Sequence, residues 1–268
     1  MLRLTYVLVV FFTMTPAFIA SLWVLDRLKL PGRRPLSVRY YRVLCKLLHV
    51  RIRVLGTPAQ GRPTLMLANH VSWLDIPVIS AVWPVAFVAK REVASWPIVG
   101  VAAKLLRTVF VDRTRRQQTP EVNAEIAQRL ADGDPVVLFA EGTSSDGNRV
   151  LEFRSALVGA VAQVDPTHQV LLQPLSIGYT RIQGVPMGRQ HRPLVAWYGD
   201  LDFGPHFKEF VRRGAVDVTV SFGEPVPFDN GSDRKSVTRA LEHRVRALTV
   251  ATLRERQGTE ATAVSTVA

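Results

Sequence analysis

The stretch of residues 65–77 combines the residue types that general acid–base catalysis needs. An apolar run ends at Asn69, His70 follows it, and Asp75 stands five residues after the histidine. Residues five apart in a helix point about 140° away from each other, so the two side chains can meet only if His70 precedes a helix that begins near Asp75. Pro77 favours such a start, because proline is tolerated near the beginning of a helix. The pattern predicts an imidazole base and the carboxylate that orients it.

A second apolar run, Val136–Phe139, leads into a small and polar turn. Glu141 supplies a carboxylate there, Gly142 allows a ligand to approach the backbone closely, and Thr143 and Ser144 offer hydroxyl groups. Ligands of open α/β sheets bind beyond the carboxyl ends of the strands, where this turn and the histidine motif would both lie. Alone, the first motif is also typical of a structural histidine at a strand end, and the second is also typical of an ordinary polar turn. The combination of the two motifs favours a binding site.

A third stretch is basic and lies between the first two. Lys90 follows one predicted strand, and Arg113 follows another at the end of the run Phe110-Val111-Asp112-Arg113. Arginine binds phosphate through two parallel hydrogen bonds and lysine acts as a point charge, so both are candidate ligands for an anionic headgroup. The alternative is a solvated basic surface. The sequence contains no glycine-rich phosphate loop, no G-x-S-x-G motif and no spacing that indicates a metal site.

Short apolar runs alternate with segments of helical pattern along most of the chain. We expect helices over residues 120–130, with Thr119 as the N-cap, over 153–164 and over 236–256. The predicted strands cover residues 51–55, 64–68, 85–89, 108–111, 136–139, 170–179, 194–198 and 217–222. This order predicts an α/β fold, a three-layer mixed sheet flanked by helices.

The N-terminal segment is long and apolar. Leu4–Leu25 contains no charged residue and would form a helix of about 33 Å, long enough to cross a bilayer. A cleaved signal peptide is a competing interpretation, and Pro16 leaves open a helix that lies in the membrane interface. Seven basic residues follow the segment up to Lys46, and only Arg3 precedes it. The positive-inside rule therefore predicts an inner-membrane protein whose main domain is on the cytoplasmic side.

Length, charge and cysteine content limit the possibilities further. The chain has 268 residues, a net charge of +12 and a single cysteine, which excludes a disulfide framework. A positive field of this strength attracts an acidic partner such as an anionic membrane, a phosphorylated substrate, an acidic carrier protein or nucleic acid. We expect a membrane anchor over residues 1–30, one domain over 31–256 and a disordered tail over 257–268.

The three motifs in this order, at His70–Asp75, at the run ending in Arg113 and at Glu141–Thr143, resemble the glycerolipid acyltransferase family. The best-known members of that family are the 1-acylglycerol-3-phosphate acyltransferases. The proline-containing segment 170–177 is similar to a fourth block of the family. The resemblance covers roughly residues 40–225, and the combination is more specific than any one motif.

The resemblance implies transfer of an acyl chain from acyl-CoA or acyl carrier protein to the free hydroxyl of a 1-acyl lysolipid, such as 1-acyl-sn-glycerol-3-phosphate. No cofactor, metal or nucleic acid is expected, and the site would face the membrane bilayer. His70 matches the family's general base and Asp75 its orienting carboxylate. Lys90 and Arg113 lie in a block associated with the acceptor headgroup. The other block that binds the acceptor matches Glu141, Gly142 and Thr143, and Ser144 adjoins it as a further candidate for substrate binding.

Two positions depart from the family pattern. Ala140 stands where the family commonly has proline, and Ser144 stands where it commonly has an arginine that would grip phosphate. The stretches 141–150 and 198–202 are similar to the bacterial branch that includes lyso-ornithine lipid acyltransferases, whose acceptor has no phosphate. Two later arginines are candidates to replace the missing one: Arg149 and Arg154.

Two other classes of function stay open from the residues alone. A non-catalytic basic module on a membrane or on nucleic acid would bind in a salt-dependent way and would be indifferent to His70. A hydrolase would release free fatty acid from the same thioester without a lysolipid acceptor.

Overall fold

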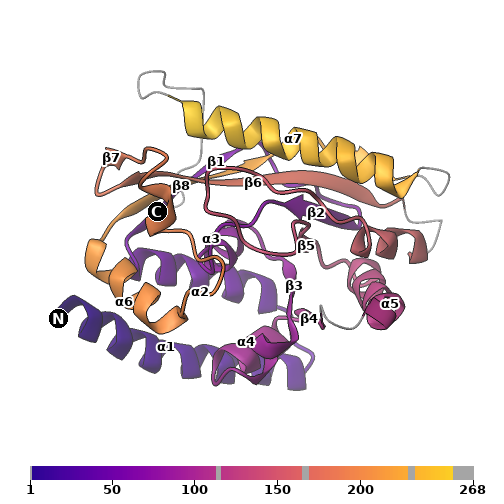
Figure 1. The fold of residues 1–268 in the computed structure, drawn as a ribbon. Helices are drawn as coiled ribbons and strands as arrows, with labels where there is room; N and C mark the ends of the chain where they lie inside the picture. The colour runs from indigo at the N-terminus through magenta and orange to yellow at the C-terminus, as the bar shows by residue number, and fades with distance from the viewer. Residues whose placement is uncertain (1, 113–115, 165–168, 229–232, 256–268) are drawn as a thin grey trace.

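A computed structural model describes residues 2–112, 116–164, 169–228 and 233–255. Its centre is one sheet with the strand order β1-β8-β6-β2-β5-β3-β4 (Figure 1). Two short strands, β7 and β9, each pair with β6. The strands are β1 (Val50–Leu55), β2 (Thr64–Ala68), β3 (Ala86–Lys90), β4 (Val109–Val111), β5 (Val136–Phe139), β6 (Leu171–Ile182), β7 (Val185–Pro186), β8 (Val216–Phe222) and β9 (Val226–Pro227).

The sheet is mixed because β6 is long enough to have different neighbours along its length. Its first residues run parallel to β2, and its second half runs antiparallel to β8. Strand β2 lies between β5 and β6, is parallel to both, and is buried at all five positions. A strand covered on both faces explains why residues 65–68 form a continuous apolar run and do not alternate.

Helices cover both faces of the sheet (Figure 1). They are α1 (Leu2–Arg27), α2 (Arg33–Leu47), α3 (Asp75–Val82), α4 (Val99–Leu105), α5 (Thr119–Ala131), α6 (Phe203–Arg213) and α7 (Arg234–Arg254). Met66 and Ala68 of β2 pack in a core with α2, α3 and α6, whereas Leu65 and Leu67 pack in another with α5 and α7. The predicted three-layer α/β architecture is therefore confirmed.

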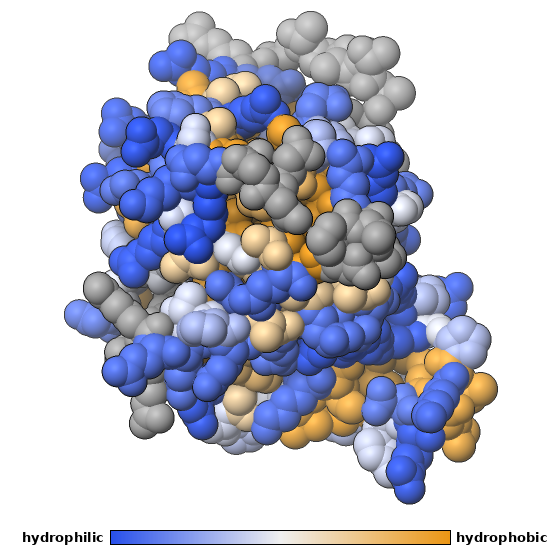
Figure 2. Space-filling view, turned by 90° about the vertical axis from the view of Figure 1, so that its right-hand side faces the viewer, coloured by the Kyte–Doolittle hydropathy of each residue, from blue (hydrophilic) through white to orange (hydrophobic). Residues whose placement is uncertain are grey.

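The first helix packs along the outside of one layer. Helix α1 contacts α2, α4 and α6, and its buried side chains Val7, Thr15, Phe18 and Leu22 lie on one side of it. It is also long and apolar enough to cross a membrane. Hydrophobic side chains reach the surface at the lower edge of the molecule (Figure 2), where α1 and α4 lie in Figure 1. The exposed ones on α1 are Leu2, Tyr6, Val9, Phe12, Trp23 and Val24.

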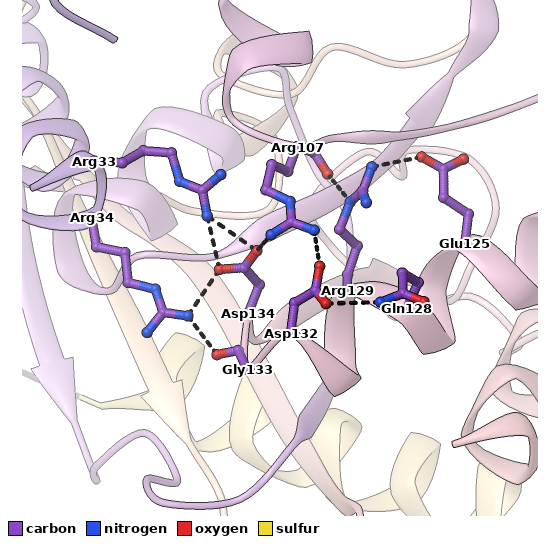
Figure 3. Close-up of polar contacts among 9 residues, drawn as sticks. All are labelled: Arg33, Arg34, Arg107, Glu125, Gln128, Arg129, Asp132, Gly133 and Asp134. Carbon is purple, nitrogen blue, oxygen red and sulfur yellow. Dashed lines mark hydrogen bonds and ion pairs between the residues drawn. The ribbon is translucent and has the colours of Figure 1, made fainter. Parts of the chain in front are cut away.

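An ion-pair network ties the start of α2 to the turn before β5 (Figure 3). Asp134, whose side chain is 8% exposed, pairs with Arg33 at 3.2 Å, Arg34 at 2.9 Å and Arg107 at 3.0 Å. Arg107 also pairs with Asp132. Because residues 33 and 134 are far apart in sequence, this network fixes the position of α2 against the sheet.

Several local predictions were wrong. Residues 194–198 do not form a strand. Leu194 ends a short 3₁₀ helix, the amides of Val195 and Ala196 donate to the carbonyl of Arg192, and these two side chains are buried. The helix predicted over 153–164 is a 3₁₀ helix over Leu157–Gln163 only. Helix α5 already contains Thr119, and its N-cap is Gln118, which makes no side-chain capping bond.

Candidate active site

The two predicted motifs meet at one edge of the sheet. His70 follows β2 and Glu141 follows β5, and these strands are parallel neighbours in which Ala68 lies opposite Phe139. The amide of Ser145 donates a hydrogen bond of 2.9 Å to the carbonyl of His70, which joins the two loops. Parallel neighbours end at the same edge, so the expected position of both motifs is confirmed.

His70 and Asp75 form the predicted pair. His70 Nδ1 lies 2.7 Å from Asp75 Oδ2, and Asp75 is the first residue of α3. The histidine precedes the helix, and Pro77 is accommodated in its first turn. This strand–turn–helix geometry brings together two side chains that would diverge within a continuous helix.

Asp75 is fully buried and its oxygens are saturated with donors. Oδ2 also accepts from the amides of Val71 at 2.7 Å and Ser72 at 3.0 Å, and Oδ1 accepts from the Tyr179 hydroxyl at 2.6 Å. Burial, followed by the charge of Asp75, raises the pKa of Tyr179 well above its usual range, so the hydroxyl stays a donor. A carboxylate surrounded by donors requires the proton of the imidazole on Nδ1.

The other ring nitrogen of His70 is available for chemistry. The His70 side chain is 16% exposed, and Nε2 makes no hydrogen bond within the described ranges. The ring stacks on Phe139 with centroids 4.1 Å apart and planes inclined by 16°. With Nδ1 protonated, Nε2 carries a lone pair that can accept a proton from a substrate.

Glu141 lies beneath the catalytic loop. Its side chain is buried, and Oε1 accepts a hydrogen bond of 3.3 Å from the amide of His70. Oε2 is buried without a hydrogen-bond partner among the described residues. Burial, assisted by the charge of Asp75, raises the pKa of Glu141 to about 8, against the lowering effect of the His70 and Leu151 amides. The carboxyl is therefore largely neutral at pH 7, and its predicted contact with the acceptor stays a prediction.

The rest of the second motif is held by a segment that the sequence analysis did not connect with it. Gly142 has a φ of 71°, a conformation that favours glycine, and Thr143 is exposed. The Ser144 hydroxyl donates to the carbonyl of Trp197 at 2.5 Å, while the amide of Trp197 donates to the carbonyl of Val71 at 2.9 Å. Trp197 thus joins both motif loops, and no short-range pattern indicates this contact.

The structure describes only part of the basic stretch between Lys90 and Arg113. Lys90 ends β3 and is exposed, and Arg113 lies outside the described residues. The neighbouring Arg91 and Lys104 line an open pocket of about 530 Å³. Headgroup binding by Lys90 and Arg113 therefore stays a prediction. Within the described part of the chain, no group of three His, Cys, Asp or Glu side chains is placed to hold a metal.

Comparisons with known proteins agree with this site. A family model described as Acyltransferase matches residues 49–178, which include both motifs. The lyso-ornithine lipid O-acyltransferase of Brucella abortus is 48% identical over 88% of this chain and 89% of its own. The 1-acyl-sn-glycerol-3-phosphate acyltransferase of Neisseria meningitidis is 31% identical over 72% of this chain and 73% of its own.

A solved structure supports the fold. The crystal structure of the 1-acyl-sn-glycerophosphate acyltransferase from Thermotoga maritima matches with a TM-score of 0.67 over 96% of both chains, at 21% sequence identity. The same conclusion follows from the histidine–aspartate pair at the sheet edge, from the family match and from the relatives that this chain matches over most of their length. The chain is an acyltransferase and belongs to the glycerolipid acyltransferase family.

Proposed function

We propose that this protein transfers an acyl chain from a thioester donor, acyl-CoA or acyl carrier protein, to the free hydroxyl of a lyso-ornithine lipid. The observation that carries the proposal is the His70–Asp75 pair: a buried carboxylate holds Nδ1 at 2.7 Å, and Nε2 makes no hydrogen bond to any residue that the structure describes. Such an imidazole can deprotonate an alcohol directly, so no covalent acyl-enzyme and no cofactor is required.

The reaction needs a single proton carrier. His70 Nε2 takes the proton of the acceptor hydroxyl while its oxygen attacks the thioester carbonyl. The tetrahedral intermediate then expels the thiolate, and His70 donates the proton to this thiolate. The products are an ester and a free thiol. Asp75 stabilises the transient imidazolium, and Tyr179 and the amides of Val71 and Ser72 hold Asp75 in place.

The choice of acceptor rests on position 144 and on the relatives. The hydroxyl of Ser144 is engaged by the Trp197 carbonyl, so this position offers no cationic fork for a phosphate. The lyso-ornithine lipid O-acyltransferases of Brucella abortus and Rhizobium meliloti are each 48% identical to this chain. The Neisseria relatives, at 31% identity, make lysophosphatidate the second candidate acceptor.

We also propose that the enzyme works at the cytoplasmic face of the inner membrane. Helix α1 buries one side against α2, α4 and α6 and exposes apolar side chains on the other, which suits a helix held against lipid by the domain. The basic residues that follow it favour the cytoplasmic side. Membrane fractionation with alkaline extraction, and protease accessibility in inverted vesicles, test this placement.

Acyl transfer is tested with purified protein in mixed micelles. Labelled acyl-CoA or acyl carrier protein is supplied with either lyso-ornithine lipid or lysophosphatidate, and the lipid products are separated. We expect acylated ornithine lipid, and no product from the His70→Ala variant. Acylation of lysophosphatidate alone would refute the proposed acceptor and leave the acyltransferase activity in place.

Two further results would refute the mechanism itself. Free fatty acid released in the absence of any acceptor would indicate a hydrolase. A His70→Ala variant that transfers acyl chains at the wild-type rate would show that His70 is not the base. His243→Ala is a suitable matched control, because His243 is an exposed histidine on α7.

A further inference from the structure

We infer that Arg154 binds the anionic group of the acceptor headgroup, through its guanidinium placed over Gly142. This inference rests on the proposed transfer to a lysolipid and names the residue that recognises its charge. The ligand chemistry is an oxyanion, which is a carboxylate in an ornithine headgroup and a phosphate in lysophosphatidate.

The first observation is the position of the Arg154 side chain. A Cβ added to Gly142 would lie 3.2 Å from both Cδ and Nε of Arg154, and 3.5 Å from its Cζ. The guanidinium therefore lies against the backbone of the loop that also carries Glu141, the hydrogen-bond partner of the His70 amide. The glycine leaves the room that this arrangement needs.

The second observation is that the base of this side chain is fixed. The amide of Arg154 donates to the carbonyl of Ala140 at 2.8 Å, and the amide of the preceding Phe153 donates to Glu242 Oε2 at 3.0 Å. Phe153 itself is buried. The backbone thus holds the exposed residue Arg154 beside the motif.

The third observation separates Arg154 from its neighbour Arg149. No hydrogen bond or ion pair joins the Arg154 side chain to any described residue, so its five donors are free for a ligand. Arg149 instead acts on Asp146. Burial raises the pKa of Asp146, but hydrogen bonds from Asn148 and the charge of Arg149 outweigh it, so the pKa is lowered. Arg149 thus already acts on an acidic side chain, whereas no ion pair of Arg154 is formed within the described ranges.

The fourth observation concerns Ser144, the other polar side chain of this loop. Its hydroxyl is used to hold Trp197, at 2.5 Å from the carbonyl oxygen. Position 144 therefore supports the loop and supplies no charge to the acceptor. A planar guanidinium binds a carboxylate or a phosphate through two parallel bonds, which makes Arg154 the side chain of this loop best suited to the headgroup.

The test compares Arg154→Ala and Arg154→Lys with the matched control Arg149→Ala. The KM for the acceptor and the KM for the acyl donor are measured separately in mixed micelles, with lyso-ornithine lipid, with its methyl ester and with lysophosphatidate. We expect Arg154→Ala to raise the acceptor KM about 10- to 100-fold and to leave the donor KM within twofold of the wild-type value. The acceptor KM of Arg154→Lys should lie between those of the wild type and Arg154→Ala, because lysine keeps the charge but loses the two parallel hydrogen bonds of the guanidinium.

The methyl ester gives a readout that a general structural defect would not change. The wild-type enzyme should discriminate against the ester, which lacks the anionic charge, and Arg154→Ala should accept acid and ester equally well. An acceptor KM for Arg154→Ala within twofold of that for Arg149→Ala, or unchanged discrimination against the ester, would overturn the inference. If the wild-type enzyme acylates lysophosphatidate alone, the proposed acceptor fails, and the role of Arg154 is still decided by the KM for lysophosphatidate.

Discussion

Replacing Asp75 with asparagine removes one negative charge from the active site and keeps the shape of the side chain. Three donors, His70 Nδ1 and the amides of Val71 and Ser72, meet at Oδ2, whereas only the Tyr179 hydroxyl meets Oδ1. The amide oxygen of the asparagine must face the three donors, because the reverse orientation would leave two backbone amides unpaired at about 1–3 kcal/mol each. Its NH₂ group can then donate to Tyr179. The hydrogen-bond pattern survives, and the charge is lost.

The expected loss of kcat in Asp75→Asn follows from the geometry of the His70–Asp75 pair. Nδ1 and Oδ2 are 2.7 Å apart. This places the two centres of charge about 4 Å apart, and at an effective dielectric constant of about 20 the imidazolium and carboxylate attract each other by about 4 kcal/mol. A hydrogen bond to a neutral oxygen retains about 1 kcal/mol of this attraction. The imidazolium exists only after proton transfer, so the remaining 3 kcal/mol or so is lost from the transition state, and kcat should fall roughly 150-fold.

The assay is the initial rate of ester formation at saturating donor and acceptor, with folding checked by circular dichroism. Asp217→Asn is the matched control, since Asp217 pairs at 2.7 Å with the exposed Arg51 and does not contact the site. We expect the control to retain its rate within twofold. A folded Asp75→Asn enzyme whose kcat is within fivefold of the wild-type value would refute the role of Asp75 in stabilising the imidazolium.

Three further predictions follow from buried or strained groups. Glu141, whose pKa rises from 4.5 to about 8 on burial, keeps a proton in the folded state that the unfolded chain loses. As the pH rises from 5 to 8, the free energy of unfolding should therefore fall by up to about 1.4 kcal/mol per pH unit relative to that of Glu141→Gln. Denaturation in detergent that depends on pH equally in both proteins would contradict this. Gly142→Ala should cost about 1–2 kcal/mol because φ is positive, and should raise the acceptor KM about tenfold by displacing Arg154, as steady-state kinetics would reveal. Asp134→Ala should lower the stability by about 2 kcal/mol, since three partly exposed arginines lose their buried partner; an unchanged melting temperature would count against it.

The sequence by itself determined the catalytic pair and the class of fold. His70, Asp75 and Pro77 lie within one strand–turn–helix unit, so local geometry decides whether their side chains meet. The continuous apolar run of β2 likewise indicates a strand buried on both faces. These features depend on neighbours a few residues away, and such patterns can be read without knowing the rest of the chain.

The tertiary structure alone decided which distant groups complete the site. Tyr179 lies 104 residues from Asp75, and it reaches the carboxylate because β6 pairs with β2. Trp197 lies in an apolar stretch that suggests a strand, yet its backbone joins the two motif loops. Such contacts depend on how strands are ordered in the sheet, which local periodicity does not specify.

The same holds for the charge state of the site. The sequence places the Glu141 carboxylate at a strand end, as a candidate to bind the acceptor. Its burial and the raised pKa of its carboxyl group depend on segments that meet only after folding, and so does the place of the Arg154 guanidinium over Gly142. The residue types at the site are therefore a property of the sequence, and their protonation and accessibility are properties of the packed chain, because both depend on what excludes water from each group.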